Sequence, residues 1–253
     1  MRKSGSGRGG FLAALFFGLV LVIPERAVAQ IPEEFTNLRV LPNDITRDDL
    51  LDVMRRFSLE LGVRCQYCHV GGDGVSFEGV EFPSDEDPDK RKARFMLRLV
   101  GNLNNTVLPL MPERDEPAVE VSCKTCHRGG PKPRLLSQEL RLALDTQGAD
   151  STAALYRRLR ETEALGGRYD FGEWETNLFA ERLASEDRQQ DAIAVYRLNA
   201  EFYPESLSIA TSLGQLYEQV GDVEQAIRSY ERALEIRPGL GGPEDRLRIL
   251  RGG

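Results

Sequence analysis

All four cysteines and both histidines of this 253-residue chain lie in two copies of one pentapeptide, C-x-x-C-H. In an exported protein, two thiols three residues apart on a helical turn can add to the two vinyl groups of a haem. The histidine that follows then reaches the iron from the same side. The pentapeptides therefore predict two covalently bound haem c groups. The attachment residues would be Cys65, Cys68, Cys123 and Cys126, and the iron ligands would be His69 and His127.

Three other uses of paired cysteines match the pattern less well. A zinc site built from two C-x-x-C pairs usually separates them by about 15 to 20 residues, whereas 54 residues lie between Cys68 and Cys123. A disulfide framework suits an exported protein but gives no reason for a histidine after each pair. A thioredoxin-like site would hold one such motif at a strand-to-helix turn, and the sequence has no strand-rich region to provide it.

Each iron also needs a sixth ligand or an open position. No histidine remains for this role, so methionine is the usual choice, and it raises the reduction potential. Beyond Met1 the chain has three methionines: Met54, Met96 and Met111. Met111 precedes Cys123 by twelve residues, close to the eleven between Met54 and Cys65, but prolines on both sides place it in an irregular loop. These residues alone leave the ligand of the second haem open between Met96 and Met111.

Two helices are expected to carry the other methionines. Residues 47–62 have Met54 on an apolar stripe of helical spacing, and Gly62 is a C-terminal stop. Met54 could be one more core residue of that stripe, but a haem is itself the core of such a small domain, so the stripe should face it. Residues 89–104 carry Met96 on a second stripe, with Asp87 as cap and the basic run 90–92 as the charged start of the helix.

The first residues have the layout of a secretory signal peptide. A basic start precedes a thirteen-residue apolar run at 11–23, and residues 27–29 form a small-x-small cleavage site. Thirteen apolar residues are too few to span a bilayer, and no later stretch of the chain is apolar for long enough. We expect cleavage near Ala29 and Gln30 and a mature protein in the periplasm, free or peripheral to the inner membrane.

The charge of the chain disfavours nucleic acid as a partner. Removal of residues 1–29 leaves 29 basic and 39 acidic side chains, a net charge of −10. An acidic protein repels phosphate backbones unless it has a local basic patch. No such block stands out in the sequence.

The C-terminal half repeats itself. "DAIAVYRLNAEFYP" and "QAIRSYERALEIRP" align at an offset of 34 residues, with small residues at helix crossings and a closing proline. This period and pattern resemble the tetratricopeptide repeat, TPR. Two repeats are expected, at about 173–206 and 207–240. Stacked repeats need covered ends, so helical segments at about 137–165 and 243–251 are expected to cap them.

The fold predicted is mainly α. A signal peptide at 1–29 would precede an N-terminal dihaem c-type cytochrome domain at 30–136, with short helices and long loops. An α-helical TPR-like solenoid would follow at 137–253. The sequence "PKP" at 131–133 marks the junction, because proline stops a helix and stiffens a linker.

The N-terminal motifs also carry a family resemblance. A helix with a methionine, a glycine turn and C-x-x-C-H, followed by "ARFML…N" and "VSCKTCHRGGPKP", resembles the cytochrome c subunit of photosynthetic reaction centres over about residues 38–133. In that family the helix methionine ahead of each motif is the axial ligand, which implies Met54 and Met96 here. The family commonly carries four haems and a lipidated N-terminal cysteine. This chain has two haem motifs and no spare cysteine.

The predicted function is single-electron transfer by a periplasmic dihaem cytochrome, an electron carrier rather than an enzyme. Its partners would be redox proteins, with a membrane reaction centre or a respiratory complex as candidates, and the TPR repeats would hold a partner protein nearby. One alternative is a dihaem peroxidase or haem-based sensor with one open iron position, for which Met111 would be a displaceable ligand. The other is a TPR scaffold whose haems are structural.

Overall fold

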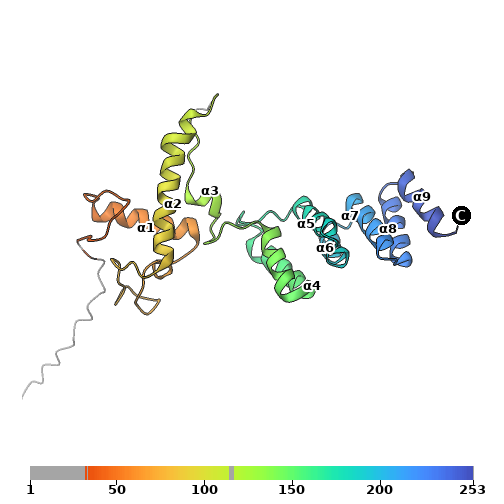
Figure 1. Cartoon of the computed structure of the whole chain (residues 1–253), viewed down its shortest axis with the longest axis horizontal. Coiled ribbons are helices and arrows are strands. Elements are labelled where there is room, and N and C mark those ends of the chain that lie inside the picture. Colours follow the sequence, from red (N-terminus) through yellow and green to blue (C-terminus); the bar gives the residue numbers. More distant parts are fainter. Residues whose placement is uncertain (1–31, 33, 114–116, 253) are drawn as a thin grey trace, which may run out of the picture.

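The computed structural model describes residues 32, 34–113 and 117–252, and nearly all of its secondary structure is helical. The expected signal peptide, 1–29, lies outside the described residues. Within the described ranges, one bridge between Gly71 and Val80 is the only β-type pairing. Helices α4 to α9 follow one another in chain order toward the C-terminus, and α1 to α3 lie at the other end of the molecule (Figure 1). The mainly α class predicted from the sequence is confirmed.

Helix α1 (Arg47–Leu61) has the expected signals at both ends. The Thr46 hydroxyl accepts a hydrogen bond from the Asp49 amide at 3.2 Å, which satisfies one of the free amide groups of the first turn. Gly62 ends the helix in the left-handed conformation, with φ 62°. The first C-x-x-C-H begins three residues later, in a short 3₁₀ turn, η1 (Cys65–Tyr67).

Helix α2 (Pro88–Asn102) begins at the predicted cap, because the Asp87 side chain accepts a hydrogen bond from the Asp89 amide at 2.7 Å. It continues into a π-helical turn, η2 (Leu103–Val107), and a 3₁₀ turn, η3 (Leu108–Leu110). The second C-x-x-C-H forms its own short helix, α3 (Cys123–His127).

The basic run 90–92, predicted as the charged start of a helix, begins α2 but does not lie wholly in solvent. Lys90 is buried, with 9% of its surface exposed, while Arg91 and Lys92 are exposed. The Lys90 ammonium group is accommodated because it donates to the backbone carbonyls of Phe82 at 2.7 Å and Ser84 at 2.6 Å.

Helix α4 (Leu136–Glu163) covers the N-terminal side of the repeats, as the sequence predicted for 137–165. It is broken at Gly148, whose φ of 81° and ψ of 179° are not helical, so its two halves turn relative to each other. Two Arg–carboxylate ion pairs tie it to the repeats, Arg141 to Glu186 at 2.6 Å and Arg157 to Glu201 at 2.6 Å.

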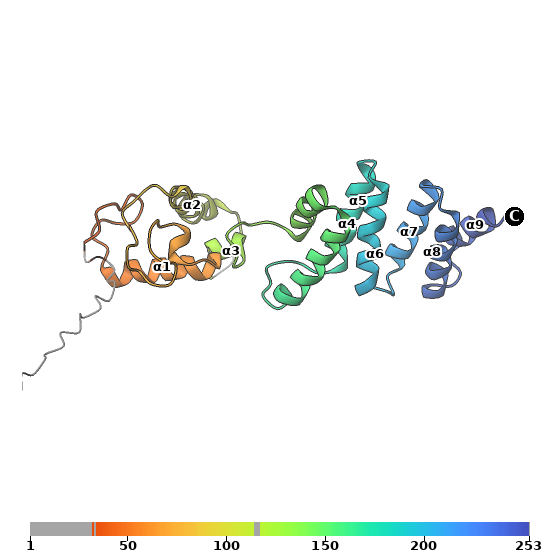
Figure 2. The ribbon, with the colours of Figure 1, turned by 90° about the horizontal axis from the view of Figure 1, so that it is seen from below.

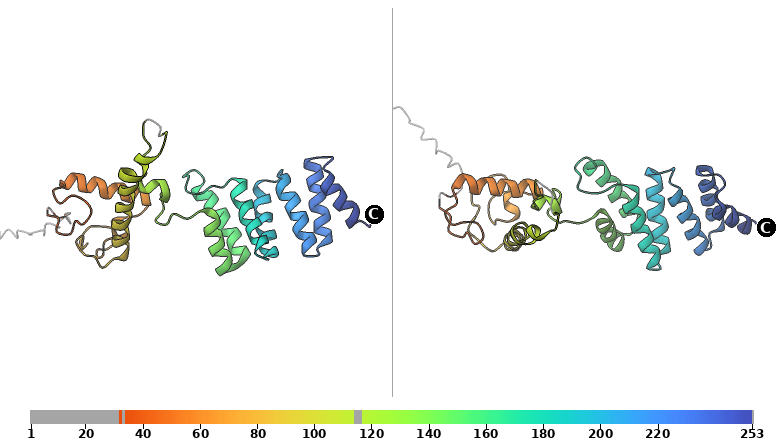
Figure 3. Two further views of the ribbon diagram at one scale, coloured as in Figure 1. Left: turned by 45° about the horizontal axis from the view of Figure 1, so that its top comes forward. Right: turned by 90° about the horizontal axis from the view of Figure 1, so that it is seen from above.

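The two predicted repeats coincide with two helix pairs. The first is α5 (Glu173–Ser185) with α6 (Gln189–Phe202), and the second is α7 (Leu207–Gln219) with α8 (Val223–Ile236). Helix α9 (Gly241–Leu250) covers the far end, and the successive helices stack side by side (Figure 3). The small residues do allow close crossing: a Cβ atom on Gly214 would lie 2.6 Å from the Tyr230 ring.

The buried apolar core is distributed unevenly along the chain. The connected cluster of buried apolar residues begins at Leu136 and runs through the repeats to Leu247. Among the described residues before Leu136, Leu50 is the only buried apolar side chain. The N-terminal part therefore packs its apolar side chains around a pocket rather than against one another. No helix in the described part of the chain has the length and apolar character needed to cross a membrane.

Candidate haem-binding sites

The first pentapeptide and Met54 lie around one pocket. Met54, on α1, shares this pocket with Cys65, Cys68 and His69. Helix α1 forms one wall and α2 another, and the loops 34–41 and 77–83 complete it. The apolar lining comes mainly from these side chains: Leu50, Leu51, Phe57, Leu61, Phe77, Phe82, Ala93 and Leu97. An apolar pocket with two thiols, an imidazole and a thioether matches the chemistry of covalently attached haem.

The spacing of the lining residues explains why the helices face the pocket. On α1 the residues at 50, 54, 57, 58 and 61 line it, and on α2 those at 90, 93, 94 and 97 do. Both sets recur every three to four residues, so each forms one face of an α-helix. The apolar stripe predicted around Met54 therefore faces the same space as the first pentapeptide.

The imidazole of His69 has the environment of a neutral ligand. Its Nδ1 is buried and forms no hydrogen bond of good geometry, and the Phe82 ring packs edge-on against it with 5.1 Å between centroids. Burial, followed by the positive charge of Lys90, lowers the pKa of His69. The Phe82 backbone, which lies beside the ring, acts in the opposite direction. Iron binds the neutral imidazole, so this environment suits coordination.

The state of the thiols disfavours the other uses of paired cysteines. All four cysteines are free, and burial raises the pKa of the Cys68 thiol to about 11. A thioredoxin-like cysteine needs a lowered thiol pKa instead. Within the described ranges, no three or more His, Cys, Asp or Glu side chains gather as a metal-ion site. The structure thus offers no zinc cluster in these ranges.

The second pentapeptide also holds its histidine in a defined orientation. The Ser122 amide donates to the Thr125 hydroxyl at 2.9 Å, which closes the first turn of α3. His127 Nδ1 lies 3.0 Å from the Gly130 carbonyl oxygen, so Nδ1 is the protonated donor. This leaves Nε2 of His127 as the nitrogen that can bind iron. The left-handed Arg128, with φ 49°, turns the chain back toward that carbonyl.

The two pentapeptides are joined by direct packing of α3 on the end of α1 (Figure 2). The Gly129 amide donates to the Glu60 carbonyl at 3.1 Å. Gly62 lies so close that a Cβ atom there would be 2.2 Å from the Gly129 oxygen. Burial, followed by the carboxylate of Glu60, raises the pKa of the Cys123 thiol. The end of the helix that carries Met54 therefore touches the second motif as well as leading into the first.

Met96 lies on a different face of α2 from the first pocket. At about 100° per residue, it is separated from the face formed by residues 90, 93, 94 and 97. Met96 is half-buried. Met111 follows η3 and is 47% exposed. The assignment of Met96 to the second haem, with Met111 as the alternative, stays a prediction.

A residue that sequence reasoning missed connects α2 to the second motif. The Asn104 side chain donates to the Val121 carbonyl and accepts from the Val121 amide, both at 2.8 Å. Val121 precedes Cys123 by two residues, so this pair fixes where α3 begins. The amide side chain in "NLNN" was the available sequence signal, but nothing in the sequence indicated its partner.

Several exposed apolar side chains lie on α2 and in the segment between α2 and the second motif. Six large apolar residues between positions 95 and 119 have at least 40% of their surface exposed: Phe95, Leu99, Val107, Leu110, Met111 and Val119. Exposed apolar side chains are typical of a ligand or partner site where they form one continuous patch. Together with the oriented His127, these side chains are compatible with a haem at α3.

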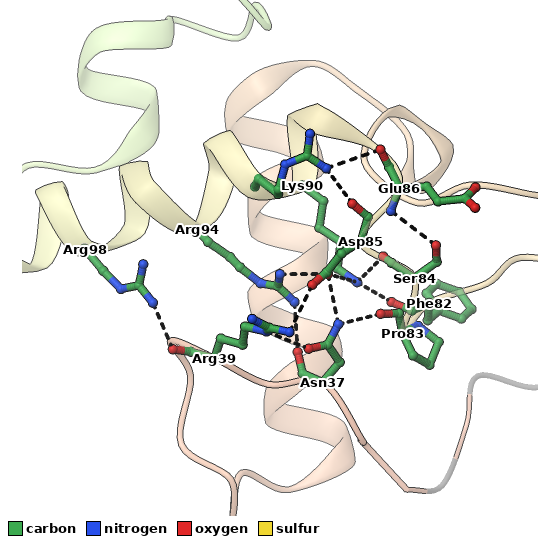
Figure 4. Close-up of polar contacts among 11 residues, drawn as sticks. Asn37, Arg39, Phe82, Pro83, Ser84, Asp85, Glu86, Lys90, Arg94 and Arg98 are labelled. Carbon is green, nitrogen blue, oxygen red and sulfur yellow. Dashed lines mark hydrogen bonds and ion pairs between the residues drawn. The ribbon is translucent and has the colours of Figure 1, made fainter.

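A cluster of charged residues beside the first pocket was also missed (Figure 4). Asp85 forms ion pairs with Arg94 at 2.7 Å and with Lys90 and Arg39 at 3.4 Å each. Asn37 also donates to Asp85, at 2.9 Å. Hydrogen bonds and ion pairs from these residues, Asn37 first, lower the pKa of Asp85 to about 2. All three cations line the pocket with His69.

Two oriented C-x-x-C-H turns, one of them facing a methionine across an apolar pocket, indicate a c-type cytochrome region followed by repeat helices. The comparisons with known proteins agree. Residues 29–143 match the family described as photosynthetic reaction centre cytochrome C subunit, and residues 210–244 match the tetratricopeptide repeat. The two resemblances noted in the sequence are thereby confirmed.

Two curated proteins show the same likeness. The chain is 41% identical over 71 residues to cytochrome c-554 of Chloroflexus aurantiacus, covering 28% of this chain and 15% of that protein. It is 29% identical over 122 residues to the photosynthetic reaction center cytochrome c subunit of Rubrivivax gelatinosus, covering 40% of this chain and 31% of that protein. The chain thus spans less than a third of either relative. These matches show a likeness to c-type cytochromes in the N-terminal half of the chain and a likeness to tetratricopeptide repeats in the C-terminal half.

Proposed function

We propose that the protein is a dihaem c-type cytochrome of the periplasm that transfers single electrons between partner proteins. The observation that supports it most directly is the shared pocket of Met54, Cys65, Cys68 and His69. These are the groups that would attach one haem and bind both faces of its iron. When bound, haem supplies an iron that changes by one electron between its ferric and ferrous forms.

The chain's own residues would orient the haems and exclude water. In the first site, Cys65 and Cys68 would form thioethers, and His69 and Met54 would be the axial ligands. In the second, Cys123 and Cys126 would attach the haem, His127 would bind iron through Nε2, and Met96 would be the sixth ligand. The packing of α3 on α1 would keep the two haems close enough for exchange within one molecule.

The division of the chain follows from this proposal. Residues 1–29 would be the signal peptide, 30–136 the cytochrome domain and 137–253 the TPR-like domain. Export is part of the proposal because the first residues have the layout of a secretory signal peptide. The candidate electron acceptors are a membrane reaction centre and a respiratory complex. The chain spans less than a third of either relative, so their partners do not assign one of the two.

The repeats would hold the redox partner. On α5, Trp174 is 68% exposed and Leu178, one turn later, is 53% exposed. Large apolar side chains in this position are unusual on a free surface and typical of a protein contact. Oxidation of the reduced protein by membrane vesicles of its host should slow in the Trp174→Ala variant, while oxidation by ferricyanide should not. Equal rates with vesicles would remove Trp174 from the contact.

The haem assignment is tested on the mature protein purified from its exporting host. We expect a mass that exceeds the polypeptide by two haems and the absorption of two low-spin irons. The reduced protein should bind carbon monoxide at neither iron. Met54→Leu should open one carbon monoxide site and lower one reduction potential, because a leucine cannot replace the thioether ligand.

The second haem is assigned by a matched pair of variants. Met96→Leu should open the other carbon monoxide site, and Met111→Leu should open none. The reverse result would assign Met111 to the second iron. A colourless protein with the mass of the bare polypeptide would overturn the whole proposal.

A further inference from the structure

Lys90 is the one charged side chain that is buried in the described part of the chain. A buried ammonium group is costly unless it is paired or hydrogen-bonded. Lys90 donates to two backbone carbonyls and lies 3.4 Å from a carboxylate oxygen of Asp85, and it lines the pocket that also holds His69. Neither the haem attachment nor the axial ligands require it.

One of its contacts leads directly to the proximal histidine. The Phe82 carbonyl accepts the Lys90 hydrogen bond at 2.7 Å, and the Phe82 ring packs on His69 with 5.1 Å between centroids. The Phe82 backbone is also the polar group that lies beside His69 Nδ1. Hydrogen bonding to the outer nitrogen of an axial histidine tunes the metal. Lys90 polarises the carbonyl that would accept this bond.

The surrounding charges leave a positive excess at this wall of the pocket (Figure 4). Asp85 is one carboxylate shared by three cations, namely Lys90, Arg94 and Arg39. Arg94 also donates to the Asn37 carbonyl at 2.9 Å, and its side chain is 14% exposed. The charges of Lys90 and Arg94, whose side chains are 11% and 14% exposed, are screened by water less than that of Arg39, whose side chain is 63% exposed.

Two other carboxylates near the motif are already engaged, although Asp87 also acts on His69, in the direction opposite to Lys90. Asp87 and Asp89 act on Cys68. The Asp87 side chain caps α2, and Asp89 pairs with the exposed Lys92 at 2.7 Å. Lys90 is therefore the buried charge that contacts Phe82, the residue whose ring packs on His69.

We propose that Lys90 sets the reduction potential of the first haem by stabilising the reduced iron. This inference rests on the proposed function. In the step concerned, ferric iron takes one electron from a protein donor and no bond forms or breaks. The iron loses one unit of positive charge, so a fixed cation beside its histidine favours the reduced form. Lys90 is a positioning residue that acts through Phe82 and through space.

The size of the effect follows from Coulomb's law. At an effective dielectric constant of about 20, a unit charge within about 12 Å of the iron changes the equilibrium constant for reduction by about tenfold or more. For a one-electron couple, tenfold corresponds to about 59 mV. The Lys90 ammonium group lies 2.7 Å from the Phe82 carbonyl oxygen, and the Phe82 backbone lies beside the His69 ring, which supports a separation of this order between the ammonium group and an iron bound to His69.

The test is a spectroelectrochemical titration of the full-length holoprotein. Lys90→Met should make one of the two couples about tenfold harder to reduce and change the other by less than twofold. Lys90→Arg should keep the potential close to that of the unmodified protein, because arginine keeps the positive charge. Lys92→Met is the matched control: it removes the same charge two residues away, at a side chain that is 71% exposed, and should move neither couple.

A further variant separates charge from structural damage. Asp85→Asn removes the only carboxylate of the cluster and should make the first couple easier to reduce, the opposite direction to Lys90→Met. If the substitutions only loosened the pocket, the reduction potential of the first haem would fall in both Lys90→Met and Asp85→Asn. Variants with both Cys123 and Cys126 changed to alanine would retain the first haem alone and assign the shifted couple.

Each outcome has one meaning. If a protein with two haems shows the same shift in Lys90→Met and Lys92→Met, or a lower potential in Asp85→Asn, the inference is wrong and the proposed function stands. If the mature protein contains no haem, the proposed function fails. If Lys90→Met cannot retain the first haem, Lys90→Arg and Asp85→Asn decide.

Discussion

The contact between Gly62 and Gly129 gives the sharpest test of how the two motifs are held together. Gly62 has φ 62°, a left-handed conformation that costs about 1 to 2 kcal/mol for a residue with a Cβ atom. In Gly62→Ala the new Cβ would also lie 2.2 Å from the Gly129 oxygen, where ordinary contact begins at 3.4 Å. One of the two backbones must therefore move by more than 1 Å. The attached helices resist this, because Gly62 ends α1 and Gly129 follows α3.

The total loss combines these two costs. Forcing an extra methyl into packed structure costs about 1 to 3 kcal/mol, so Gly62→Ala should lose about 2 to 5 kcal/mol in all. Gly74→Ala is the matched control. Gly74 has φ 80° but no atom within 4 Å of its would-be Cβ, so it should lose only the backbone cost.

The assay is thermal unfolding of the haem-loaded protein, followed by haem absorbance so that the repeats do not contribute. For a unit of about 100 residues, 1 kcal/mol shifts Tm by about 4 to 8 °C. The 1 to 3 kcal/mol that separates the two variants should therefore appear as a difference of about 4 to 24 °C in Tm. Equal losses in Gly62→Ala and Gly74→Ala would show that α1 and α3 are not in contact at this point.

Three further predictions concern the repeats, the second motif and acid stability. Gly214→Ala should destabilise the repeats in urea by about 1 to 3 kcal/mol, because it presses on a buried tyrosine ring, whereas Gly241→Ala, in open space, should not. Asn104→Ala should remove two hydrogen bonds, cost about 1 to 3 kcal/mol and alter the spectrum of the second haem; the exposed neighbour Asn105→Ala should leave it unchanged. The pKa of Asp85 falls from 3.8 to about 2 on folding, so its stabilising contribution is present above pH 3.8 and is lost as the pH falls toward 2. Between pH 3.8 and about 2, the free energy of unfolding of the unmodified protein should therefore fall more steeply than that of the Asp85→Asn variant. Parallel curves of unfolding free energy against pH would contradict this.

Much of the fold followed from local sequence patterns. The period of 34 residues predicted both repeats, and the structure places helix pairs α5–α6 and α7–α8 at those positions. The caps at Asp87 and Gly62 were also predicted, because each acts within its own turn of chain. The break at Gly148 was not expected. A single glycine is often tolerated within a helix, and only the packing of both halves of α4 against the repeats shows that the chain turns there.

The candidate site divides in the same way. The first pentapeptide and its spacing to Met54 are local, and the structure brings those residues to one pocket. The burial of Lys90 depends on a loop folding over it, which no local pattern in the sequence indicates.

The pairing of the two motifs is a contact between residues far apart in the sequence. It depends on glycine at 62 and on the turn at Arg128, which let two backbones meet where side chains would keep them apart. Each of these residues alone indicates only a helix end. Their meeting makes the end of α1 a shared support for both motifs, so a disturbance at Gly62 should affect both haems, whereas one at Asn104 should affect only the second.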